Sequence, residues 1–156
     1  MIRWIVFMLM PLLIGGCGED IWNEPSGQWK VVWQPDFTVS FTDVYAIDSQ
    51  KVWAVGYDGT VVYTNNGGAK WTKRDIGTTA PLRQVQFVDA QHGWILEGTL
   101  SLFRTKDGGN HWEKFPVPNL IKFCFVNDKI GYAIGAGGTT VLRTVNGGEN
   151  WIQTNF

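Results

Sequence analysis

The chain has 156 residues with 13 Lys and Arg against 14 Asp and Glu, a net charge of −1, and 44% of its residues are hydrophobic. This composition excludes an intrinsically disordered chain and a polybasic nucleic-acid-binding protein. With 19 Gly, nine Trp and only two Cys, the sequence excludes a disulfide-stabilised scaffold and predicts one domain of short aromatic strands joined by tight turns.

The N-terminal segment, residues 1–16, is predicted to be a signal peptide. Arg3 precedes an apolar run over residues 5–14, which is too short to cross a bilayer as a helix. Residues 14–17, Ile-Gly-Gly-Cys, resemble the bacterial lipobox. That resemblance implies export, cleavage directly before Cys17 and acylation of Cys17, which would anchor the protein to a cell-envelope membrane at its periplasmic or extracellular face. A chance thiol near an ordinary cleavage site is the alternative.

The remaining chain contains one motif three times. The motif begins with Thr, contains Gly-Gly and ends with Trp, and its final residues are Trp71, Trp112 and Trp151. Two upstream segments repeat in the same order. A repeat of roughly 40 residues is typical of the four-stranded blades of a β-propeller. The sequence therefore predicts β-propeller-type blades of four antiparallel strands, one each in residues 36–76, 77–117 and 118–156. The predicted strands are 41–47, 52–57, 60–64 and 71–74; 83–88, 93–97, 100–105 and 112–115; and 121–126, 131–135, 140–144 and 151–154.

The residues of the motif indicate a turn between the third and fourth strands of each blade. The Thr hydroxyl and the Asp or Asn side chain can exchange hydrogen bonds within the turn, the Gly pair permits left-handed backbone, and the Trp anchors the next strand. The predicted structural residues are Thr64, Asn66, Gly68 and Trp71; Thr105, Asp107, Gly109 and Trp112; and Thr144, Asn146, Gly148 and Trp151.

These motifs resemble Asp-box repeats, also called bacterial neuraminidase repeats, whose pattern is Ser/Thr-x-Asp-x-Gly-x-Thr-Trp. Asp107 matches the acidic position, and Asn66 and Asn146 replace it with the amide. Together with second strands such as Val-Trp-Ala-Val-Gly at residues 52–56, they make the chain most similar to the photosystem II stability/assembly factor-like family. The resemblance implies a non-catalytic module for protein interaction or complex assembly, with a protein partner such as a membrane complex.

Resemblance to this family also suggests that Arg104 and Arg143, each directly before the Thr of its motif, belong to a surface patch that binds the partner. Arg83 and Lys122 are weaker additions to that patch. The alternative is that each Arg packs over a neighbouring aromatic ring or pairs with a local acid.

Asp-box propellers also occur in sialidases and other glycosidases, so a glycan-binding protein or a glycoside hydrolase is the alternative function. Hydrolysis needs two carboxylates at a defined separation, whereas most acids here fall at repeated turn positions. The two His residues, His92 and His111, are not spaced as metal ligands, and Cys124 lies in an apolar strand. We therefore expect no catalytic residue, no metal and no cofactor. A chain without retained activity is the third alternative.

Three repeats are fewer than the four to eight blades of closed propellers, and the open sheet edges invite pairing. The sequence therefore predicts either an incomplete propeller or one completed by a homo-oligomer, for example around a two-fold axis. Trp29 precedes Trp71 by the length of one repeat. Residues 17–35 are accordingly expected to be a tether with a remnant of a preceding blade.

Overall fold

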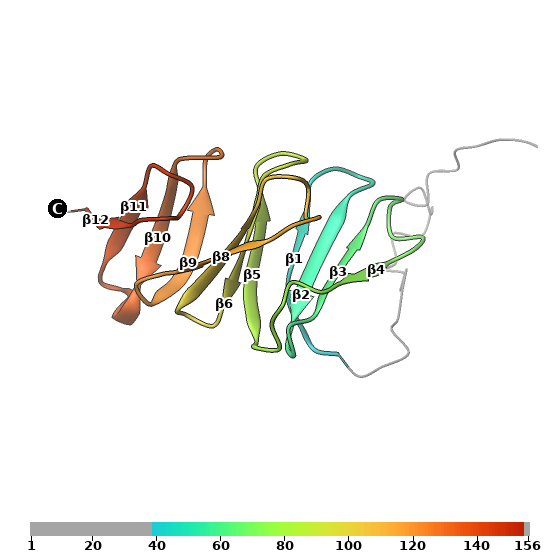
Figure 1. The fold of residues 1–156 in the computed structure, drawn as a ribbon, viewed down its shortest axis with the longest axis horizontal. Coiled ribbons are helices and arrows are strands. Elements are labelled where there is room, and N and C mark those ends of the chain that lie inside the picture. The colour runs from blue at the N-terminus through green and yellow to red at the C-terminus, as the bar shows by residue number, and fades with distance from the viewer. Residues whose placement is uncertain (1–38, 155–156) are drawn as a thin grey trace, which may run out of the picture. The chain divides into compact units, whose positions relative to one another are not determined.

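The computed structural model describes residues 39–154, which form three four-stranded antiparallel sheets (Figure 1). The strands of each sheet lie in chain order, because hairpins join each strand to the next. The first sheet consists of β1 (Phe41–Ala46), β2 (Val52–Gly56), β3 (Val61–Thr64) and β4 (Thr72–Arg74). The second consists of β5 (Leu82–Phe87), β6 (Gly93–Glu97), β7 (Ser101–Thr105) and β8 (Glu113–Pro116). The third consists of β9 (Leu120–Phe125), β10 (Gly131–Gly135), β11 (Val141–Thr144) and β12 (Ile152–Gln153), with a 3₁₀ turn, η1 (Ala136–Gly138), before β11.

These sheets confirm the predicted all-β fold of four-stranded blades. The hairpin between β2 and β3 turns through Asp58 and Gly59, whose φ angles are 55° and 63°. Positive φ at both positions gives the turn a backbone twist that matches the flanking strands.

The outer strand of each sheet begins one residue later than the sequence predicts. The indole N–H of Trp112 donates to the carbonyl of Gly109 (3.2 Å), and that of Trp151 donates to Gly148 (3.1 Å). The Trp side chain therefore closes the preceding turn. The strands that follow these turns are β8, which begins at Glu113, and β12, which begins at Ile152.

Two apolar cores lie between successive sheets. In the core between the first and second sheets, Trp53 of β2 stacks on Phe87 of β5 with 5.1 Å between ring centroids. In the core between the second and third sheets, Trp94 of β6 stacks on Phe125 of β9 at 3.7 Å. An aromatic ring on the second strand of one sheet thus packs on the first strand of the next, and this repeated contact holds neighbouring sheets together.

The predicted signal peptide, Cys17 and the tether at residues 17–35 lie outside the described residues. Within residues 39–154, no helix has the length and apolar character needed to cross a membrane.

Candidate protein-binding site

The first strands of the three sheets line a groove with a volume of about 490 Å³. Because β1, β5 and β9 belong to three successive repeats and are far apart in the sequence, the groove exists only where the sheets pack together. Its lining combines exposed apolar side chains with charged and amide groups from Asp43, Val44, Tyr45, Arg83, Gln84, Val85, Gln86, Ile121, Lys122, Phe123 and Cys124.

Each of the three first strands carries one extra residue at the same place. The pairing register shifts at Thr42 in β1, at Arg83 in β5 and at Ile121 in β9. A bulge of this kind redirects the side chain of the inserted residue. The hydroxyl of Thr42 donates to the carbonyl of Leu82 (2.6 Å), whereas Arg83 and Ile121 are exposed and line the groove.

Side-chain hydrogen bonds join the first strands to one another. A carboxylate oxygen of Asp43 accepts the backbone N–H of Val85 (2.8 Å). The amide of Gln84 donates to the carbonyl of Phe123 (2.7 Å) and accepts its N–H (3.0 Å). Gln86 makes the same pair of bonds with Phe125 (2.9 and 2.8 Å). These bonds fix the floor of the groove before any ligand binds.

The cations of the groove are Arg83 and Lys122. Both side chains are exposed, and neither forms an ion pair within residues 39–154. Two exposed apolar side chains, Val44 and Ile121, lie in the same lining. The groove can therefore bind an extended segment that presents a carboxylate to the cations and apolar side chains to the floor.

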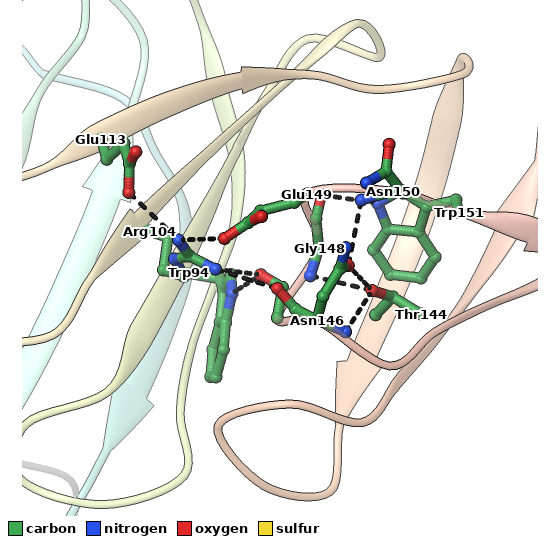
Figure 2. A network of polar contacts seen from close by, with 10 residues as sticks. Trp94, Arg104, Glu113, Thr144, Asn146, Gly148, Glu149, Asn150 and Trp151 are labelled. Carbon is green, nitrogen blue, oxygen red and sulfur yellow. Dashed lines mark hydrogen bonds and ion pairs between the residues drawn. The ribbon is translucent and has the colours of Figure 1, made fainter.

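Arg104 lies away from this groove, between the second and third sheets (Figure 2). It is only 5% exposed, and one of its terminal nitrogens donates to the carbonyl of Asn146 (3.0 Å). The other donates to Glu149 (2.8 Å) and Glu113 (3.1 Å). Arg104 thus connects β7 to the third Asp-box turn. The chain uses these donors internally, and the role of Arg104 in binding a partner stays a prediction.

Arg143 occupies the corresponding place in the third sheet. It lies on β11 opposite Tyr132 of β10 and Ile152 of β12. The Arg143 side chain is half-buried, and the described part of the chain offers it no ion pair. Arg104 and Arg143 therefore lie on equivalent faces of successive sheets, one covered and the other open. Partner binding by Arg143 also stays a prediction.

The three Asp-box turns share one hydrogen-bond pattern. In the first, the hydroxyl of Thr64 donates to Asn66 (2.8 Å) and accepts the N–H of Gly68 (3.0 Å). The corresponding bonds are 2.9 Å and 2.9 Å in the second turn, and 2.9 Å and 3.0 Å in the third. Asp107 in the second turn also accepts the backbone N–H of His111, which together with the His111 ring lowers the pKa of Asp107 to about 2.

Other acids that a glycosidase could use also lie in turns. Asp48 accepts the backbone N–H groups of Gln50 and Lys51, and these bonds lower its pKa. Burial raises the pKa of Asp89, but the hydrogen bonds from the His92 side chain and from backbone N–H groups outweigh it, so this pKa is also lowered. A general acid needs a raised pKa, and these acids have the opposite shift.

The His residues lie in separate turns, where His92 pairs with Asp89 and His111 pairs with Asp107. Among the described residues, no group of three or more His, Cys, Asp or Glu side chains is arranged to hold a metal ion. The expectations of no metal, no cofactor and no catalysis stay predictions.

The chain matches the family model of the photosynthesis system II assembly factor YCF48 over residues 21–117 and 69–156. The chain belongs to this family. The match confirms the resemblance that the repeated motifs predict, and the YCF48 family is a family of assembly factors.

Two curated YCF48 proteins are similar to the chain. The photosystem II assembly lipoprotein Ycf48 of Synechococcus sp. (strain CC9902) is 27% identical over 94% of the chain and 47% of its own length. The photosystem II assembly protein Ycf48 of Thermosynechococcus vestitus (strain NIES-2133 / IAM M-273 / BP-1) is 37% identical over 28% of the chain and 12% of its own length. The chain thus spans less than half the length of these relatives.

Solved YCF48 structures have the same fold. A structure of YCF48 bound to D1 peptide has a TM-score of 0.67 and 26% identity, over 78% of the chain and 41% of that protein. YCF48 from Cyanidioschyzon merolae has a TM-score of 0.68 and 20% identity, over 77% of the chain and 38% of that protein. An ancestral GH74 enzyme has a TM-score of 0.58 and 16% identity, over 74% of the chain and 18% of the enzyme. The likeness to this enzyme extends to the fold alone.

Proposed function

We propose that this chain is a non-catalytic assembly module that binds an extended segment of a membrane-complex protein in the groove formed by β1, β5 and β9. The observation that carries the proposal is the pair of exposed cations, Arg83 and Lys122, beside apolar side chains on a hydrogen-bonded floor. The D1 peptide bound to a YCF48 relative supports a peptide as the ligand class.

The groove suits a segment with a carboxylate better than a neutral one. Hydrogen bonds to charged groups each contribute about 1.5–3 kcal/mol, and the exposed apolar side chains of Val44 and Ile121 add contact area. Asp43 offsets only one of the two cations, Arg83 and Lys122, so the groove lining keeps a net positive charge. Binding of this kind weakens as salt screens the exposed charges.

The test is a fluorescence-anisotropy titration of the full chain with a labelled D1 peptide. We expect Arg83→Glu and Lys122→Glu each to weaken binding by about tenfold, because each reverses one attractive charge. Lys106→Glu is the matched control, since Lys106 is an exposed cation in the second Asp-box turn and is not part of the groove lining. Absence of binding, or equal loss in all three variants, would disprove the proposal.

We further propose that the chain is exported and anchored by lipid at Cys17. The lipoprotein relative from Synechococcus supports an anchored protein, and residues 14–17 supply the motif. In a bacterial host fed radiolabelled palmitate, the full chain should incorporate label in the membrane fraction, and Cys17→Ser should abolish it. Cys124→Ser is the control that should keep the label. Equal labelling of both variants would contradict acylation at Cys17.

A further inference from the structure

Glu97, the last residue of β6, is a buried acid that the other two repeats lack. It is 8% exposed, and the corresponding residues of the first and third sheets are Gly56 and Gly135. A carboxylate is costly to bury unless it is paired and hydrogen-bonded. The contacts that Glu97 makes in the second sheet must therefore compensate for its burial.

Two groups balance the Glu97 carboxylate. One oxygen accepts the hydroxyl of Thr78, and the other forms an ion pair with the ammonium group of Lys114 on β8 at 2.6 Å. Burial raises the pKa of Glu97, but Lys114 and Thr78 together outweigh it, so this pKa is lowered. Glu97 is therefore charged at neutral pH, and its charge is matched by Lys114 rather than by Arg83.

Thr78 belongs to the connection between β4 and β5, residues 75–81. This connection is longer than residues 117–119, which join β8 to β9 in the next repeat. A longer connection has more conformations to lose when it is ordered, so it needs more contacts to hold it. The bond from Thr78 to Glu97 is one such contact. The shorter connection has no counterpart, because Gly135 stands at the position of Glu97.

Backbone groups hold the same loop from both sheets. The N–H of Gly59 in the first sheet donates to the carbonyl of Ala80 (3.1 Å), and the N–H of Gly98 in the second donates to the carbonyl of Pro81 (2.9 Å). The approach of Gly59 is close, since a Cβ there would lie 1.9 Å from the carbonyl oxygen of Thr78. The loop is thus fixed between the first two sheets.

The loop leads directly into the bulge that carries Arg83. Leu82 pairs in register with Glu97, and the register shift follows at Arg83. Glu97 therefore contacts the chain on both sides of Pro81, through its backbone at Leu82 and through its carboxylate at Thr78. Because a bulge sets the direction of the inserted side chain, these contacts bear on where Arg83 points.

We propose that Glu97 is a positioning residue for the groove: by holding the loop through Thr78, it fixes the bulge from which Arg83 meets the ligand. This inference rests on the proposed binding of an extended segment in the groove. A side chain presented by an ordered backbone loses less conformational entropy on binding. Glu97 thus strengthens binding although it is not part of the groove lining.

The experiment is a double-mutant cycle between Glu97 and Arg83, measured by fluorescence anisotropy of labelled D1 peptide with the full chain. Glu97→Ala should weaken binding about three- to tenfold, which is the order expected for ordering one long side chain on binding. In the Arg83→Ala background the same substitution should change binding less than about twofold, because Glu97 acts through Arg83. Glu97→Gln should restore most of the affinity, since its amide oxygen can still accept the hydroxyl of Thr78.

The loop supplies a matched pair of variants. Thr78→Val removes the hydroxyl that Glu97 accepts and should weaken binding as Glu97→Ala does. Thr79→Val changes the exposed neighbour in the same loop and should leave the affinity unchanged. Circular dichroism checks that each variant folds. Equal affinities for Thr78→Val and Thr79→Val would overturn the proposal, and so would a loss from Glu97→Ala that persists in full without Arg83.

NMR of the free chain separates this proposal from the proposed function. Thr78→Val should move the backbone amide signal of Arg83 and leave that of Lys122 in place. An unmoved Arg83 signal would overturn the positioning role even if the peptide binds. If the peptide binds to no variant, the proposed function fails, and the Arg83 signal still decides whether Glu97 fixes the bulge.

Discussion

At the scale of single residues, the Asp-box turns show that Asp and Asn can fill the same position. Asn66 and Asn146 each accept the hydroxyl of the preceding Thr through an amide oxygen, as Asp107 does through a carboxylate. The carboxylate differs in its charge, and it also pairs with the ring of His111 at 2.5 Å. Among the three Asp-box turns, only the second should therefore lose stability in acid through protonation at this position, which Asp107 occupies.

We predict that Asp107→Asn removes part of the pH dependence of stability. The pKa of Asp107 in the folded chain, about 2, lies below its ordinary value of 3.8. A lowered pKa stabilises the fold above the ordinary value, and this stabilisation is lost as the pH falls toward the folded value. In urea unfolding, the wild type should have the larger free energy of unfolding at neutral pH. This difference between the two proteins should shrink below about pH 4. A difference that stays constant down to about pH 2 would contradict this account.

At the scale of elements, the strand positions follow from the sequence but the contacts between sheets do not. Apolar strands and Gly turns at a regular period suffice to predict twelve strands, and the structure shifts their ends by only a few residues. Arg104 and Arg143 look equivalent in the sequence because both precede the Thr of a box. The third Asp-box turn packs on β7 and is joined to Arg104 by hydrogen bonds between distant segments. Only this packing makes Arg104 a buried connector and leaves Arg143 open.

This difference predicts unequal costs for the same substitution. Arg104→Met should lower the free energy of unfolding by about 1–3 kcal/mol, because buried carbonyl groups and two partly exposed acids lose a charged donor. Arg143→Met at the equivalent position should cost less than about 1 kcal/mol. Urea titrations followed by Trp fluorescence measure both values. Equal losses would show that the hydrogen bonds of Arg104 between the sheets add no net stability.

At the scale of the whole molecule, the groove could be predicted only in part. The repeats identify Arg83 and Lys122 as basic residues on first strands, but they do not show that β1, β5 and β9 face a common space. They also conceal the bulges at Thr42, Arg83 and Ile121, because an inserted residue looks like ordinary strand sequence. The curvature of the sheets and the register of their strands arise from packing between distant segments, so neither can be predicted from the sequence of one repeat.

The most direct test of protein binding in the groove is an NMR titration of the isotope-labelled full chain with D1 peptide. The account predicts that backbone amide shifts concentrate on β1, β5 and β9, around Arg83 and Lys122, and that the outer strands β11 and β12 of the third sheet stay unchanged. Shifts confined to β11 and β12, or no shifts with the peptide in large excess, would contradict binding in the groove.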